Sequence, residues 1–122
     1  MSCRGIRGAT TVEVDSADAI LAATGDLLLR MVEANHAAVA DIASAIFTMT
    51  PDLTAAFPAR AARELGWQHV PLLDAQEVPV PGSLSHCVRV LLLWNTDRSQ
   101  EEVRHVYLRE AASLRPDLRE DE

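Results

Sequence analysis

Hydrophobic and polar positions alternate over several short stretches of this chain, and each of these stretches predicts a β-strand. Residues 3–13 (CRGIRGATTVE) alternate and are rich in β-forming residues. Residues 87–95 (CVRVLLLWN) are apolar on both faces, so we expect a central strand there. Residues 46–50 (IFTMT) also alternate, and residues 69–73 (HVPLL) are typical of a short strand. The segment 77–83 contains too much proline for a central strand, which favours a loop or an edge segment.

Apolar residues recur at helical spacing elsewhere. A helix is predicted from an N-cap at Asp15 or Ser16 to Asn35. Residues 37–45 are alanine-rich, and their pattern leaves helix and strand open. Residues 57–66 predict a short helix, with proline in the first turn and glycine at the end.

The C-terminal part gives weaker signals. Ser99 and Glu102 form a potential capping box that would open a helix. Residues 105–108 fit a strand equally well, followed by a helix over 109–114. We expect the polar tail from about residue 115 to be flexible. Strands and helices interleave without a linker or repeat, which predicts a single mixed α and β domain over residues 1–122.

The composition narrows the class of partner. With 48% hydrophobic residues and only 4% aromatic ones, the chain is globular with an aliphatic core. A net charge of -7 argues against nucleic acid as a partner. No apolar run approaches the roughly 20 residues of a membrane span, and no signal-like segment opens the chain, so we expect no membrane partner and a cytoplasmic location. Cys3 and Cys87 are expected to be buried free thiols.

Arginine is the residue type with the clearest chemical meaning here. All 11 basic residues are arginine, the cation best suited to binding carboxylates through two hydrogen bonds. Arg89 lies in the most apolar strand, where a guanidinium needs an anion. That anion is either Glu77, in a structural salt bridge, or a bound ligand, unless the strand end lets Arg89 reach solvent. Arg7, between Gly5 and Gly8, favours an anionic ligand, because glycine leaves space beside a strand.

The other familiar catalytic patterns are missing from the sequence. Arg60 and Arg63 share one face of the predicted short helix, which is either a solvated surface or part of a site. The four histidines show no metal-ligand spacing, so we expect no metal site. No glycine-rich phosphate loop, CxxC pair or nucleophile motif is present. Several arginines with Glu77 and Tyr107 suit binding and electrostatic stabilisation better than covalent catalysis.

Five collinear segments resemble the monofunctional AroH-class (Bacillus-type) chorismate mutases from about Arg4 to Leu118. They are RGIRGATTVE, TPDLTAAFPARAARELGW, VPLLDAQEVPVPGSL, CVRVLLLWNTD and RHVYLREAASLRPDL. The resemblance implies a small α+β domain with a mixed sheet and flanking helices. Three copies would form a homotrimeric pseudo-α/β-barrel with active sites between subunits. The implied reaction is the Claisen rearrangement of chorismate to prephenate in phenylalanine and tyrosine biosynthesis, without a cofactor.

The resemblance also implies roles for individual residues. Arg7, with Tyr107 nearby, would bind the carboxylate of the enolpyruvyl side chain. Arg89 would lie between that carboxylate and the ether oxygen, and Glu77 would accept a hydrogen bond from the ring hydroxyl. The remaining implied positions bind substrate: Phe57 and Leu114 in the pocket wall, Arg60, Arg63 and Arg115 near its mouth, and Leu73 and Asp74 on the other side. The chain departs from the family at Leu73 and Asp74, where a small polar residue and a cysteine are common.

Two other functions remain open from the sequence. A related trimeric fold with an arginine in an intersubunit cleft occurs in the Rid/YjgF imine deaminases. A non-catalytic trimer that senses an acid of the aromatic pathway is the second alternative. Turnover of chorismate by the purified protein discriminates among the three.

Overall fold

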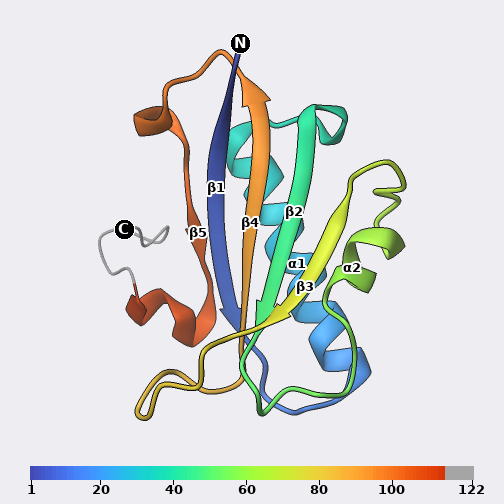
Figure 1. Cartoon of the computed structure of the whole chain (residues 1–122), viewed down its shortest axis with the longest axis vertical. Helices are drawn as coiled ribbons and strands as arrows, with labels where there is room; N and C mark the ends of the chain where they lie inside the picture. The colour runs from blue at the N-terminus through green and yellow to red at the C-terminus, as the bar shows by residue number, and fades with distance from the viewer. Residues whose placement is uncertain (115–122) are drawn as a thin grey trace.

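The computed structural model describes residues 1–114, which form one five-stranded sheet with helices (Figure 1). Along the chain the strands and helices are β1 (Ser2–Thr11), α1 (Ala17–Asn35), β2 (Ile42–Met49), α2 (Ala59–Glu64), β3 (Leu72–Gln76), β4 (Cys87–Thr96) and β5 (Val106–Tyr107). Three short 3₁₀ helices complete the described chain: η1 (Val39–Asp41), η2 (Gln100–Glu102) and η3 (Arg109–Leu114). This α+β architecture agrees with the predicted class.

The sheet is mixed, with the strand order β3-β2-β4-β1-β5. β4 pairs antiparallel with β1 and with β2, and it is central, as the sequence predicts. β5 runs parallel to β1, and β3 runs parallel to β2, so the two short strands form the edges. Figure 1 shows β4 between β1 and β2 along the whole sheet.

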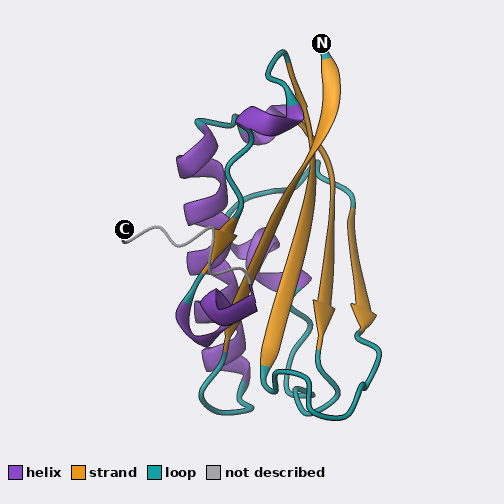
Figure 2. Cartoon of the chain, turned by 90° about the vertical axis from the view of Figure 1, so that its left-hand side faces the viewer, coloured by secondary structure: helices purple, strands orange, loops and turns teal. Residues whose placement is uncertain are grey.

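The two faces of the sheet are covered differently. Figure 2 shows the helices on one side of the strands, where α1 packs along the sheet. Alternate residues of β4 are buried on that side, from Val88 through Val90 and Leu92 to Trp94. The residues between them, such as Arg89 and Leu91, are only partly buried. In residues 1–114, no helix covers this second face, which we call the open face.

Gly8 on β1 lies against side chains of α1. A Cβ atom at Gly8 would collide with the Met31 sulfur and lie 3.1 Å from Leu27 Cδ1. On this side of the strand, α1 therefore fills the space that the sequence analysis left to a ligand, whereas on the opposite face of the sheet Gly8 does line a pocket, together with Arg7 and Arg89. The helix itself begins and ends as predicted: the Ser16 hydroxyl accepts a hydrogen bond from Ala19, and His36 closes the helix with a left-handed backbone (φ 51°).

Several predicted boundaries differ from the structure. The ambiguous segment 37–45 holds only the single turn of η1, after which β2 begins at Ile42, earlier than predicted. The strand predicted at 69–73 is displaced to Leu72–Gln76. The predicted helices after Ser99 and over 109–114 are both 3₁₀ helices, η2 and η3.

Two further expectations concern the burial of the two cysteines and the absence of a membrane-spanning helix. Cys87 is a buried free thiol, whereas Cys3 is exposed, so the expectation of burial is wrong for Cys3. None of the helices in residues 1–114 combines the length and apolar character that crossing a bilayer requires.

Candidate active site

An ion pair stands on the open face of the sheet. Arg89 on β4 donates from Nε to Oε2 of Glu77, which follows β3, at 2.9 Å. The Thr48 hydroxyl on β2 donates to the same Oε2 at 2.7 Å. The strand register explains this meeting, because Thr48 pairs with Arg89 on one side and with Ala75 on the other. The side chain of Glu77 is only 14% exposed, so its carboxylate depends on these two donors.

A pocket of about 280 Å³ lies beside this ion pair, and we call it the sheet pocket. Arg7 on β1 and Tyr107 on β5 contribute to it together with Arg89. β1 brings them together, because Ala9 pairs with Arg89 on one side and with Tyr107 on the other. The full lining is Arg7, Gly8, Ile46, Thr48, Arg89, Val90, Leu91 and Tyr107.

Tyr107 has an apolar environment. It packs in one cluster with Ala9, Cys87 and Ala111, and Leu114 packs against that cluster.

Burial raises the pKa of the Cys87 thiol to about 11, although the positive charge of Arg89 acts to lower it. Cys87 is therefore protonated near neutral pH and lacks the thiolate that a nucleophile needs.

The other candidate residues lie outside the sheet pocket. Phe57, before α2, is 72% exposed, and Leu73 on β3 is 62% exposed. Arg60 forms an ion pair with Glu64 along α2 at 3.2 Å. Arg63 is also exposed on α2, and Arg115 lies outside the described residues.

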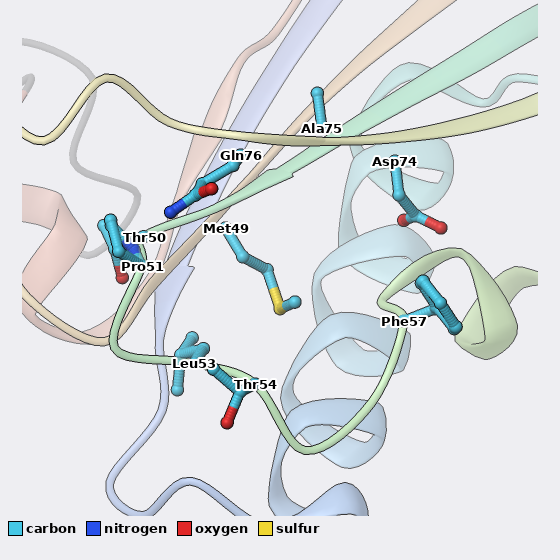
Figure 3. A pocket seen from close by; sticks show the side chains of 9 residues that line it. All are labelled: Met49, Thr50, Pro51, Leu53, Thr54, Phe57, Asp74, Ala75 and Gln76. Atoms are coloured by element: carbon cyan, nitrogen blue, oxygen red, sulfur yellow. The ribbon is translucent and has the colours of Figure 1, made fainter.

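Asp74 lies on β3 and reaches toward α2. Its Oδ1 accepts a hydrogen bond from the backbone amide of Ala59 at 3.0 Å. Burial raises the pKa of the Asp74 carboxyl above its usual range, although the Ala59 amide and the charge of Arg63 act to lower it. Figure 3 shows Asp74 and Phe57 at the same end of a second pocket of about 330 Å³, which we call the edge pocket. It is lined by Met49, Thr50, Pro51, Leu53, Thr54, Phe57, Asp74, Ala75 and Gln76.

The structure thus divides the candidate residues into two groups within one chain. Arg7, Arg89, Glu77 and Tyr107 meet at the sheet pocket, with Leu114 behind Tyr107. Phe57, Arg60, Arg63 and Asp74 gather around α2 and the edge of the sheet.

Sequence reasoning missed Thr48 as a site residue. Its one usable signal was the alternation of IFTMT, which places Thr48 on the same face as Ile46. Within residues 1–114, no cluster of three or more histidine, cysteine or acidic side chains is arranged to hold a metal ion.

Comparisons with known proteins agree over nearly the whole chain. A family model described as chorismate mutase type I matches residues 3–118. The chain is 63% identical over 116 residues to a protein named chorismate mutase AroH from Thermus thermophilus, covering 94% of this chain and 95% of that protein. It is 50% identical over 119 residues to the protein of the same name from Bacillus subtilis strain 168, covering 97% and 94%.

A solved structure agrees as well. The chorismate mutase from Clostridium thermocellum superposes with a TM-score of 0.88 at 50% identity, covering 89% of this chain and 97% of that one.

Proposed function

This chain belongs to the chorismate mutase type I family, and on that premise we propose that it rearranges chorismate to prephenate at its sheet pocket. The observation that carries the proposal is the Arg89–Glu77 pair, which stands on the open face beside Arg7 and Tyr107. The arrangement offers guanidinium groups to an anionic substrate and a carboxylate to its hydroxyl. The product leads toward phenylalanine and tyrosine.

Arg89 is proposed to stabilise the transition state. As the C–O bond of chorismate stretches, negative charge develops on the ether oxygen. Glu77 takes the Nε hydrogen of Arg89, so the terminal nitrogens of the guanidinium remain to donate to that oxygen. A donor fixed in advance costs no reorganisation during the reaction, which is why such groups lower barriers better than water does.

Arg7 and Glu77 are proposed to hold the substrate in its reactive shape. Arg7 binds the enolpyruvyl carboxylate together with Tyr107. Oε2 of Glu77 is already bonded to Arg89 and Thr48, so Oε1 is the oxygen that accepts the ring hydroxyl. The rearrangement is unimolecular, so holding the two reacting ends together supplies much of the catalysis.

The second group of residues is proposed to act on a neighbouring copy of the chain. Three copies would pack with their open faces inward as a homotrimeric pseudo-barrel. Phe57, Leu73, Arg60, Arg63 and the tail residue Arg115 would then complete the pocket of an adjacent subunit, with Asp74 beside them on β3. Leu114, which lies behind Tyr107, would contribute to the wall of the pocket. Two observations support this assembly: the open face has no helical cover within residues 1–114, and Phe57 and Leu73 are large apolar side chains left in solvent.

A direct assay tests the activity. Purified protein is expected to remove the ultraviolet absorbance of chorismate, and acid treatment of the product should give phenylpyruvate. Absence of turnover would reject the proposed function in favour of a binding module or a different reaction. Light scattering tests the assembly separately, with the mass of three chains expected and the mass of one chain contradicting it.

A further inference from the structure

The helix α2 has little to hold its N-terminus in place. It contains only six residues, Ala59–Glu64, which is too short to be stable alone. Its N-cap is Pro58, whose side chain makes no capping hydrogen bond. Its buried residues are all alanines, Ala59, Ala61 and Ala62, so they offer little apolar area for packing.

Asp74 supplies the missing cap from another element. Its carboxylate accepts the hydrogen bond of the Ala59 amide, the first residue of α2, at 3.0 Å. β3 is parallel to β2, and Asp74 pairs there with the fully buried Phe47, so the carboxylate extends from a fixed strand. Figure 3 shows this side chain directed from β3 toward the segment that carries Phe57.

The same carboxylate also acts on Arg63. Ala59 and Arg63 are four residues apart, so they lie on the same side of α2. The charge of Arg63 acts to lower the pKa of Asp74 against the larger effect of burial, which agrees with this placement of the two residues. Asp74 therefore holds the beginning of the helix on the side that also carries Arg63, one turn further on.

We propose that Asp74 is a positioning residue that ties α2 to β3 and so fixes Arg63 for the substrate, rather than a group that contacts the substrate. The inference rests on the proposed function for the role of Arg63. It changes the role of Asp74 from the one that the family resemblance implies.

A double-mutant cycle with steady-state kinetics tests the coupling. Asp74→Ala is expected to raise KM for chorismate about fivefold and to leave kcat within about twofold of the wild type. The fivefold change is roughly the binding ratio that corresponds to the free energy of one helix cap. In the Arg63→Ala background, the same change should alter KM less than about twofold, since the group it positions is gone. If Asp74→Ala changes KM equally in both backgrounds, the proposal is overturned. That result would indicate that Asp74 contacts the substrate directly or that its loss destabilises the whole protein.

Conservative and matched variants separate the hydrogen bond from the charge. Asp74→Asn keeps an acceptor oxygen for Ala59 and is expected to leave KM within about twofold of the wild type. The proposal is wrong if Asp74→Asn is as impaired as Asp74→Ala. Glu102→Ala is the control, because Glu102 also accepts a backbone amide, that of Ser99 at 2.8 Å, but on η2. It should change neither kcat nor KM.

Hydrogen exchange of the Ala59 amide provides a readout that does not depend on activity. Exchange should accelerate in Asp74→Ala and stay near the wild-type rate in Asp74→Asn. If the exchange rate of the Ala59 amide is unchanged in Asp74→Ala, Asp74 does not hold the N-terminus of α2, and the proposal is overturned whether or not the enzyme is active. A wild-type protein that leaves chorismate unchanged but shows this pattern would instead reject only the proposed function.

Discussion

Arg89 and Glu77 limit each other's freedom on the open face. The bond between Nε and Oε2 fixes one edge of the guanidinium, and Thr48 fixes the carboxylate from the other side. Each of the three side chains stands on or beside a different strand of the sheet. The geometry of the pair is therefore set by strand register rather than by a flexible loop, which is the arrangement that electrostatic catalysis requires.

Replacing Arg89 should affect the chemical step most. Arg89→Ala is expected to lower kcat by about 10²–10³, which corresponds to the loss of one fixed donor to the developing charge. Arg63→Ala, by comparison, should act mainly on kcat/KM. Stopped-flow or steady-state measurement of chorismate consumption checks both, and a near-normal kcat for Arg89→Ala would contradict the electrostatic role.

Arg89→Lys refines the same question. Lysine keeps the positive charge but loses the planar fork with which an arginine can bond two partners at once, here Glu77 and the proposed substrate. We expect kcat to stay well below that of the wild type. A variant close to wild type would mean that charge alone is sufficient.

Thr48 offers a test of how the carboxylate is held. Thr48→Val preserves the shape of the side chain but removes the donor to Glu77, and we expect a loss of about fivefold in kcat, the equivalent of one net hydrogen bond. Ser44→Ala on the same strand is the matched control and should have little effect. Equal kinetics for Thr48→Val and the wild type would show that Arg89 alone holds Glu77.

The sequence could indicate the charges of the site but not their partners. Arg89 called for an anion, and Glu77 was one of the candidates from the sequence; the structure shows the two bonded. Thr48 gave no chemical signal, because its role depends on the register that places it opposite Arg89. Asp74 was read as a substrate contact, and its bond to Ala59 depends on a β3 boundary that the sequence misplaced.

At the level of elements, the contact between β1 and α1 depends on Gly8. Gly8→Ala is expected to destabilise the fold by about 1–3 kcal/mol, because the new methyl group overlaps the Met31 sulfur and this fully buried side chain has to repack. Gly25→Ala on α1 is the control, since no atom lies within 4 Å of the added Cβ. It should stabilise the helix by about 0.5–1 kcal/mol. Urea denaturation followed by circular dichroism measures both, and an equal response of the two variants would contradict the tight packing at Gly8.

Strands and helices with a strong local sequence pattern could be predicted, whereas a strand whose bounds depend on pairing with another strand could not. β4 and α1 show long, consistent periodicity, and both were placed within a few residues. β3 extends through Asp74 to Gln76 although these residues favour loops, because pairing with Thr48 and Met49 of β2 overrides their propensity. Pairing of that kind is a tertiary effect that a local pattern does not contain.

At the level of the whole molecule, two aspartates join the loops at one end of the sheet. Asp15, after β1, accepts hydrogen bonds from the amides of Thr54 and Ala55, which lower its pKa. Burial acts to raise the pKa of Asp52, but the Thr50 hydroxyl and the His86 amide hold it below its usual value. The charged carboxylates of Asp15 and Asp52 therefore join three loops: the loop after β1, the loop after β2 and the loop before β4.

These ties predict a loss of stability in acid. A carboxyl with a lowered pKa in the folded state stabilises the fold above its ordinary value near 4, and the contribution disappears as the pH falls through the folded-state pKa. The free energy of unfolding should therefore decrease below about pH 4. Asp15→Asn should be less stable than the wild type at pH 7, and the gap should narrow toward pH 3. If the difference in stability between Asp15→Asn and the wild type stays constant from pH 7 to pH 3, the charge of Asp15 does not contribute to the fold in this way.

The uncovered face of the sheet has a kinetic consequence. On the proposed assembly, each catalytic centre draws side chains from two copies of the chain, so an isolated copy carries only part of a centre. Mass action then governs activity: below the concentration at which copies separate, turnover per milligram should fall as the solution is diluted, and it should recover on concentration. Substrate bound between two copies would hold them together and shift this threshold to lower concentration.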